Sequence, residues 1–411
     1  MREDFDAIVV GGGIGGAALA TALSRAGRAV LVLEKSTVYR DHVRGEWLAP
    51  WGVVELVELG LYDAARAGGA HHLSRHETRD EELTADEAAL QALDLTTLVP
   101  GIPGPLCIRH PVLCQILIEQ AAQAGAAVRR GVGDVRVSLG PRPRVDYAHD
   151  GTIHSVGGRL MVGADGRGSS VRRQAGIALR RDPTHHLFGG MLIEGAERWP
   201  ADLQAVGAAG DVHFLVFPQG EGRVRLYLGY ALEQAHRFAG GRGPQALLDA
   251  FRLPCMPGSE HLADAQPAGP CASYPNEDTW ADRVAQDGLV LIGDAAGSND
   301  PIIGQGLSIT MRDVRLVRDA LLGEAEWSPG IFTPYAAERA ERMRRLRLVA
   351  TMIAALHNEF GDAASARRRH VHHRRMEDPT IALPFMAALI GPANLPAEAF
   401  DEGALGRFLG A

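Results

Sequence analysis

Cysteine is scarce in this chain of 411 residues, and its spacing excludes the common structural uses of that residue. Cys107, Cys114, Cys255 and Cys271 form no Cys-x-x-Cys pair, and no histidine stands at a zinc-ligand spacing from them. We therefore expect no metal centre. We interpret the cysteines as reduced, buried thiols of a cytoplasmic protein.

Long hydrophobic runs and an excess of positive charge are also missing. No apolar run approaches the roughly 20 residues that span a bilayer, and the N-terminus enters an expected strand directly, which fits no signal peptide. Lysine is scarce, and the net charge of -8 favours neither a nucleic acid nor an anionic membrane as partner. We expect a cytoplasmic monomer or homodimer without stable membrane association.

One segment, residues 367–375, contradicts this charge balance because it reads Arg-Arg-Arg-His-Val-His-His-Arg-Arg. A metal site or a nucleic-acid contact is conceivable there. However, no acidic or cysteine side chain completes a metal site, and the rest of the chain is negative. We interpret the segment as a solvated, partly disordered basic stretch.

The N-terminal residues predict a strand, a glycine-rich loop, a helix and a second strand. Ala7 to Val10 is a short apolar run, the residues from Ala17 to Ala26 are typical of a helix, and Ala29 to Leu33 is a second apolar run that ends at Glu34. This order is the unit from which parallel α/β sheets are built. The chain length further favours two domains.

The loop of this unit carries a dinucleotide-binding fingerprint, Gly-x-Gly-x-x-Gly, at Gly11, Gly13 and Gly16, with Ile14 and Gly15 inside it. The first glycine permits a tight turn, the second allows the backbone to approach a pyrophosphate, and the third brings helix and strand together. The pyrophosphate then lies at the helix N-terminus. Glu34 is placed to accept hydrogen bonds from a ribose diol, and we assign its neighbour Lys35 to the same cofactor-binding set. The fingerprint alone does not separate NAD from FAD.

The middle of the chain changes from helical to β patterns. Residues 53–67 have helical spacing, residues 74–84 fit an edge strand or a loop, and residues 111–124 fit an amphipathic helix. From residue 187 to 230 the pattern predicts strands, with a hairpin turn at residues 219–222. Thr333-Pro334 then opens a long helix.

Two further glycine-containing motifs follow expected strands. Residues 163–172 contain Asp165-Gly166, and residues 288–307 contain Gly293-Asp294 followed by a glycine-rich loop. Asp294 comes directly after a buried strand, so its carboxylate emerges at the sheet edge where ligands bind in open α/β sheets. A carboxylate there accepts hydrogen bonds from the hydroxyl groups of a sugar-alcohol chain.

Together the three motifs resemble the signature set of the para-hydroxybenzoate-hydroxylase-like (group A) flavoprotein monooxygenases, over roughly residues 1–350. The resemblance implies an α/β fold: an FAD-binding Rossmann-like domain with a parallel sheet, discontinuous in sequence, an inserted antiparallel β-sheet substrate domain, and C-terminal helices. We expect the FAD-binding domain at 1–75, 105–180 and 276–330. The substrate domain is expected at 76–104 and 181–275, and the helical region at 331–411.

The resemblance also assigns roles to particular residues. It places Asp294 at the ribityl chain, Asp165-Gly166 at both FAD and the nicotinamide cofactor, and Arg44 and Arg109 at the flavin nucleotide. The loop at the flavin ring would comprise Pro301, Gly304, Gln305, Gly306 and Leu307. Arg44 and Arg109 have an alternative reading as surface arginines. Val135 fits either the adenine or the core.

The activity that the resemblance implies needs FAD, with NAD(P)H as transient electron donor and molecular oxygen as co-substrate. A flavin C4a-hydroperoxide would hydroxylate or epoxidise a small aromatic, polyketide-type or other secondary-metabolite substrate, so no metal and no protein nucleophile are required. We assign no catalytic side chain. Candidates for the substrate wall are Trp47, His213, Phe217, Arg225 and Tyr227, each of which also fits a plain core or sheet-surface position.

One departure from the family pattern leaves the reaction open. Gly297 stands where phenol hydroxylases of the family commonly have histidine after Gly-Asp-Ala-Ala. The run is more similar to the branch that holds flavin-dependent halogenases and prenyl reductases, although the chain has no Trp-x-Trp-x-Ile-Pro motif. A flavoprotein reductase or a halogenase-like enzyme therefore remains the alternative to a monooxygenase.

Overall fold

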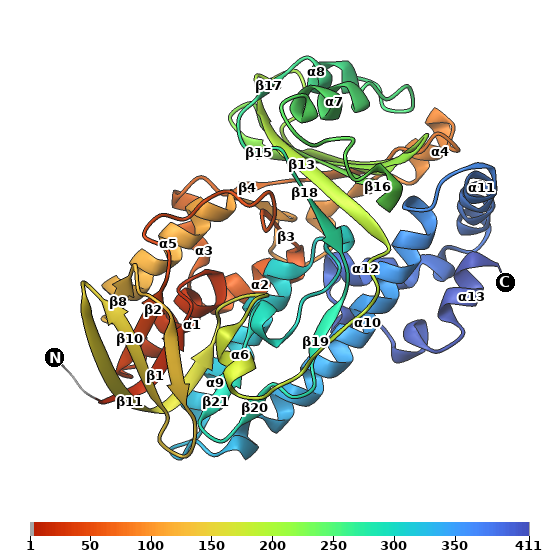
Figure 1. Ribbon diagram of the computed structural model, residues 1–411. Helices are drawn as coiled ribbons and strands as arrows, with labels where there is room; N and C mark the ends of the chain where they lie inside the picture. Colours follow the sequence, from red (N-terminus) through yellow and green to blue (C-terminus); the bar gives the residue numbers. More distant parts are fainter. Residues whose placement is uncertain (1–3, 411) are drawn as a thin grey trace.

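The structure of the protein is a computed structural model that describes residues 4–410. It contains two large sheets and a set of C-terminal helices, arranged as Figure 1 shows. In the view of Figure 1 the first sheet is at the lower left, and the second sheet lies above it. Within residues 4–410 no helix is both long and apolar enough to cross a bilayer.

The first sheet is built around a parallel core. Its strands, in spatial order, are β20 (Ala285–Gln286), β21 (Leu289–Leu291), β11 (Thr152–Gly163), β1 (Asp4–Val10), β2 (Val30–Glu34) and β8 (Ala127–Arg130). All neighbours from β21 to β8 pair in parallel, and their buried positions are rich in Val, Ile and Leu, as doubly covered parallel strands require. Antiparallel strands β10 (Arg144–His149) and β9 (Val135–Ser138) extend the sheet from β11.

Three helices cover this core and carry the expected motifs. Helix α1 (Ile14–Arg25) follows the fingerprint and packs between α5 (His110–Gln123) and α9 (Gly306–Gly323). The core therefore assembles segments from the start, the middle and the last third of the described chain. Because parallel strands point their carboxyl ends to one edge, the loops after β1 and β21 meet there.

The second sheet is largely antiparallel. Its order is β17 (Gln266–Pro267), β13 (His186–Glu194), β16 (Arg223–Tyr230), β15 (Val212–Gly220), β14 (Leu203–Ala209), β5 (Arg75–Thr78) and β6 (Leu93–Asp94), with β18 (Ala272–Asn276) on β13. The β15–β16 hairpin turns at Glu221 and Gly222, whose φ angles of 53° and 68° are those of a primed hairpin turn. One face packs on α7 (Gly243–Ala250) and α8 (Ser259–Ala263).

The other face of the second sheet meets the C-terminal helices. Helix α10 (Thr333–His357) is the longest, and α11 (Asp362–Glu377), α12 (Leu383–Ile390) and α13 (Ala404–Leu409) follow it. Leu215 and Tyr227 of the sheet share a buried apolar cluster with Met343 and Leu346 of α10. The predicted fold class, a parallel FAD-type core with a separate antiparallel sheet and C-terminal helices, is confirmed.

Several expectations about single elements were wrong. The stretch 53–67 is two helices, α2 (Pro50–Glu58) and α3 (Tyr62–Ala67), because Gly60 adopts a φ of 64° between them. Segment 74–84 contains β5, which is an interior strand, since β14 and β6 flank it. The basic stretch 367–375 is ordered and lies within α11, with the side chain of Arg368 fully buried against Asp80 and Glu81.

A candidate flavin and substrate cavity

A single cavity of about 900 Å³ runs between the first sheet, the second sheet and the C-terminal helices. One end is lined by the fingerprint, with Gly13, Ile14 and Gly15, and by Gly293 and Asp294. The other end is lined by strands of the second sheet and by α12. The loop Pro301 to Leu307 lies between these ends and borders both.

The fingerprint glycines differ in what surrounds them. A Cβ atom on Gly11 would collide with the carbonyl of Ala164, and one on Gly16 would collide with the carbonyl of Gly11. A Cβ on Gly13 would meet no protein atom within 4 Å, and the φ of Gly13, -73°, is open to any residue. Gly11 and Gly16 are thus required by close contacts within the protein backbone. Gly13, in contrast, borders free space in the cavity at the N-terminus of α1. This geometry fits the pyrophosphate of a dinucleotide.

Glu34 closes the loop from the neighbouring strand. Its Oε2 accepts a hydrogen bond of 2.7 Å from the N–H of Gly12, and its Oε1 accepts one of 2.6 Å from Ser36. Each carboxylate oxygen retains a free lone pair for the hydroxyl groups of a ribose. Lys35 points elsewhere: it is exposed and pairs with Asp134 at 3.7 Å.

Val132, not Val135, lies beside Glu34. The N–H of Val132 donates to the carbonyl oxygen of Glu34 at 3.1 Å, whereas Val135 begins β9 in the antiparallel extension. The carbonyl of Val135 accepts a hydrogen bond from Gln174. Neither Val132 nor Val135 lines the cavity, so the assignment of Val135 to the adenine stays a prediction.

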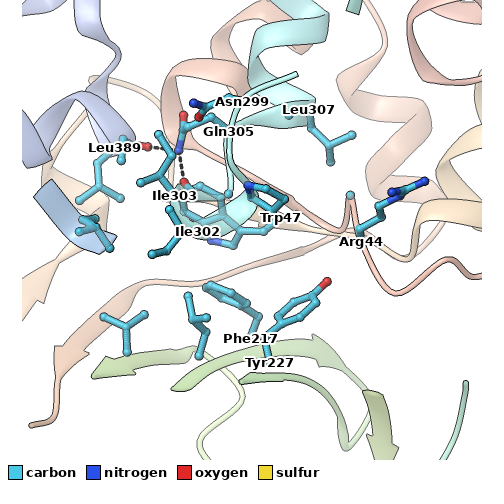
Figure 2. Close-up of a pocket in the computed structure, with 18 of the residues that line it drawn as sticks. Arg44, Trp47, Phe217, Tyr227, Asn299, Ile302, Ile303, Gln305, Leu307 and Leu389 are labelled. Atoms are coloured by element: carbon cyan, nitrogen blue, oxygen red, sulfur yellow. Dashed lines mark hydrogen bonds between the residues drawn. The ribbon is translucent and has the colours of Figure 1, made fainter. Parts of the chain in front are cut away.

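Two arginines and one carboxylate face the middle of the cavity. Asp294 Oδ2 lies 3.3 Å from Nε of Arg167, and burial together with the charge of Arg167 lowers the pKa of Arg44. The residue before Arg44, Val43, has a φ of 57°, an unusual value for a β-branched side chain, and is held by Asp41 and Tyr274. This constrained backbone directs Arg44 into the cavity, as Figure 2 shows.

Asp165 and Arg109 do not line the cavity, although their neighbours do. The carboxylate of Asp165 accepts hydrogen bonds from Ser169 and from the N–H groups of Ser170 and Val171, so it organises the start of α6 (Ser170–Gln174). Gly166 and Arg167 after it reach the cavity. Arg109 is exposed at the N-terminus of α5, and the cavity is lined instead by His110.

The loop from Pro301 to Leu307 is held rigidly. Gly304 has a φ of 65° beside the ring of Trp47, and a Cβ on Gly306 would meet no protein atom within 4 Å. Gln305 is buried, accepts a hydrogen bond of 2.8 Å from Nε1 of Trp51, and donates to the carbonyls of Ile303 and Ala388. The N-terminus of α9 therefore points at open space, where its positive end stabilises negative charge on a bound ring.

Three of the proposed substrate-wall residues line the cavity. Trp47 lies between the loop and an aromatic pair, with its ring centroid 5.9 Å from that of Phe217, and Phe217 lies 6.3 Å from Tyr227 (Figure 2). All three are cavity-lining residues. Their rings, which are tilted to one another, offer an aromatic and largely apolar surface to a substrate.

The other two wall candidates, His213 and Arg225, are correctly placed on the same sheet face but are covered. His213 stacks on His357 of α10, with ring centroids 5.1 Å apart. Arg225 is fully buried and forms ion pairs with Asp41 and Glu46. Alternation along a strand predicts the face, but it does not show which other element lies over each position.

A further set of lining residues was missed by sequence reasoning. They belong to α4 (Ala85–Leu90), to strands of the second sheet or to the C-terminal helices, where no motif marked them. The set comprises His76, Leu90, Leu93, Gln204, His357, Arg375, Leu383, Phe385, Met386 and Leu389. The apolar run 381–390 was the available signal, because a short, strongly apolar segment near a chain end needs a surface to cover.

Comparison with known proteins shows the family to which the chain belongs. The sequence profile of the FAD binding domain matches residues 4–348. The chain belongs to this FAD-binding family. The match includes all three motifs, and it ends before the last turns of α10, so α11 and α12 lie outside it. The predicted membership of the para-hydroxybenzoate-hydroxylase-like flavoproteins and the FAD cofactor are confirmed.

Relatives of this FAD-binding protein include both reductases and monooxygenases. It is 28% identical over 341 residues to digeranylgeranylglycerophospholipid reductase 1 of Methanococcoides burtonii, covering 79% of this chain and 76% of the relative. It is 28% identical over 344 residues to rifampicin monooxygenase of Streptomyces venezuelae, covering 82% and 68%. The chain spans only 54% of squalene epoxidase 2 of Arabidopsis thaliana, at 25% identity over 77% of this chain.

Among solved structures, p-nitrophenol 4-monooxygenase from Pseudomonas putida superposes with a TM-score of 0.79 at 18% identity, over 92% of this chain and 95% of that enzyme. At this identity the likeness concerns the fold. The family evidence supports an FAD-dependent oxidoreductase of the monooxygenase type, and the reaction itself has to be argued from the cavity.

Proposed function

We propose that this protein is an FAD-dependent monooxygenase that uses NAD(P)H and molecular oxygen to hydroxylate or epoxidise an aromatic, polyketide-type or related apolar molecule. The observation that carries the proposal is the continuity of the cavity from the fingerprint, past the loop 301–307, to a largely apolar wall. A flavin ring held at that loop would face this apolar wall.

Bound FAD supplies the redox chemistry, accepting a hydride from NAD(P)H and delivering one oxygen atom from O2 to the substrate. The residues of this chain bind and orient. Gly13 and the N-terminus of α1 receive the pyrophosphate, Glu34 the ribose, and Asp294 the ribityl chain. Gly304, Gly306 and Leu307 border the ring, while Trp47, Phe217 and Tyr227 form an apolar surface on the substrate side.

A reductase acting on an alkene is the second candidate, supported by the likeness to the archaeal phospholipid reductase. The Gly297 departure does not favour it. Gly297 has a φ of 116°, and a Cβ there would collide with the backbone of Thr279 and Trp280 in β19 (Thr279–Ala281). Glycine at this position is required by close packing, so it carries no information about the reaction.

The test is to incubate the purified holoenzyme with NADH or NADPH and each of a set of candidate aromatic and polyene substrates, and to measure NAD(P)H oxidation and product formation. We expect substrate to accelerate flavin reduction and one atom of ¹⁸O2 to enter the product. Full product formation under anaerobic conditions, with two hydrogens gained and no oxygen label, would establish the reductase instead.

A further inference from the structure

The end of the cavity away from the FAD motifs contains a small polar group in otherwise apolar walls. It consists of His76 from β5, His357 from α10 and Arg375 from α11. The family match ends at residue 348, so His357 and Arg375 lie beyond the part of the chain that the family shares. Of the three, only His76 lies within the family match.

Within residues 4–410, Arg375 of α11 forms no ion pair with an acidic side chain. Arg367, Arg368 and Arg369 each form an ion pair, with Glu359, Glu81 and Glu82 respectively. The neighbouring Arg374 donates to the carbonyl of Arg407. The guanidinium of Arg375 instead lies 5.9 Å from the ring centroid of Phe385, and burial lowers its pKa.

The two histidines beside Arg375 supply no negative charge and no second cation. Gln204 Nε2 lies 2.9 Å from Nδ1 of His76, and Gln204 Oε1 accepts from Nε1 of Trp47, so the amide must donate to Nδ1. The proton of neutral His76 is therefore on Nε2. Burial and the charge of Arg375 lower the pKa of His76 to about 4, and burial above all lowers that of His357 to about 3. Both rings are neutral at pH 7.

The cavity wall near Arg375 is mostly apolar. Leu93, Leu383, Phe385 and Met386 line the cavity, as does Leu90, which is exposed. A partly buried cation without a counter-ion is costly, and Arg375 has only hydrogen-bond donors. The Nε2–H of His76 is also a donor, and its one protein contact is a long one, 3.5 Å to Oγ1 of Thr78. An anionic oxygen acceptor satisfies both groups at once, and a guanidinium binds a carboxylate through two parallel hydrogen bonds.

We propose that the substrate is an organic acid whose apolar body lies against the α12 wall and whose carboxylate binds Arg375, with His76 as a neutral donor beside it. The proposal rests on the proposed function in placing the substrate here, and it makes Arg375 a specificity-determining residue. The reacting atom is then on the opposite part of the molecule, towards Trp47 and the loop 301–307.

Binding tests this inference without turnover or oxygen. The probes are benzoate, 2-naphthoate and 2-anthroate, each paired with its primary amide, titrated into oxidised holoenzyme while the flavin absorbance is followed. We expect at least one carboxylate to bind the wild-type protein about tenfold or more tightly than its amide. The reason is that the loss of a charge-assisted hydrogen bond lowers the affinity about ten- to a hundredfold. In Arg375→Gln this preference should disappear.

Arg374→Gln is the matched control, because it removes the same charge from the adjacent position of the same helix outside the cavity, and it should keep the preference. Arg375→Gln should also unfold close to the wild-type temperature, since it loses no ion pair and only the long contact with the ring of Phe385. A wild-type protein that binds no carboxylate above its amide, equal preference in Arg375→Gln, or a marked fall in its unfolding temperature would each overturn the proposal. None of these results depends on whether the enzyme hydroxylates or reduces.

Discussion

At the scale of single residues, a substitution at Gly13 tests ligand binding without disturbing the fold. Its φ suits any residue and its Cβ position is open, so Gly13→Val should fold normally and yet block the pyrophosphate sterically. We expect apoprotein with an unchanged unfolding temperature and little bound FAD, measured by flavin absorbance after purification with added FAD. Gly16→Ala is the contrasting variant, because its Cβ would collide with the Gly11 carbonyl and lower stability itself. Normal FAD occupancy in Gly13→Val would refute the placement of the pyrophosphate.

Asp294 provides a second test at the same scale. Replacement with alanine removes the carboxylate acceptor for ribityl hydroxyls, and a hydrogen bond to a charged group is worth about 1.5–3 kcal/mol, or roughly ten- to a hundredfold in FAD affinity. Arg167 loses its partner, but its side chain is one-third exposed and remains hydrated. Fluorescence titration of apoprotein with FAD measures the effect. Asp319→Ala, on the exposed side of α9, should leave FAD affinity unchanged, and an equal effect in both variants would contradict the assignment.

At the scale of elements, Gln305 connects the flavin loop to α12. Its side chain accepts from Trp51 and donates to the carbonyl of Ala388, so Gln305→Ala leaves the buried Trp51 N–H without a partner. We expect a loss of about 1–3 kcal/mol in the free energy of unfolding, measured by urea denaturation, and faster hydrogen exchange in α12. Gln245→Ala, which removes an exposed side chain of α7, should change neither. Unchanged exchange in α12 would show that this connection is not what holds the helix.

The elements also show where sequence reasoning succeeds and where it stops. The presence of α1 after the fingerprint and the position of Asp294 after a buried strand followed from local patterns, because glycine spacing and a strand end act within a few residues of chain. The helix itself begins at Ile14, three residues before the expected Ala17. The order of α11 did not, since Arg368 is neutralised by Asp80 and Glu81, 287 or more residues away in sequence. His357 lies over His213, and Glu46 pairs with Arg225; both are likewise contacts between segments that are distant in sequence. The basic composition of residues 367–375 therefore predicted a solvated segment, because the acidic partners of its arginines are far away in the sequence.

At the scale of the whole molecule, several buried groups couple stability to pH. Burial depresses the pKa of His76 and His110 to about 4 and that of His357 to about 3, and the pKa of His213 falls well below its ordinary value. The unfolded chain binds protons at these four sites below about pH 6.5, and the folded chain does not. Their contribution to stability is thus complete above pH 6.5 and is lost as the pH falls towards 4.

Two buried carboxyl groups act in the opposite direction. Burial raises the pKa of Glu46 to about 7 and that of Asp278 to about 6, so the folded protein retains these protons where the unfolded chain has lost them. Lowering the pH from 7 to 4.5 therefore stabilises the fold at these two sites. At pH 5.5 the histidines still outnumber the carboxyl groups, and the unfolded state binds about two more protons than the folded state. Each such proton is worth about 1.4 kcal/mol per pH unit.

The free energy of unfolding of the holoenzyme should accordingly fall by roughly 2–3 kcal/mol per pH unit between pH 6 and 5, before most exposed carboxylates titrate. Urea denaturation at closely spaced pH values measures this slope. His357→Gln removes one histidine from the balance and should flatten the dependence, whereas Glu46→Gln removes an opposing carboxyl and should steepen it, even if each variant changes the stability at pH 7. Because the two substitutions move the slope in opposite directions, a general loss of stability cannot imitate the result. A slope that is the same in all three proteins would show that these buried groups do not govern acid unfolding.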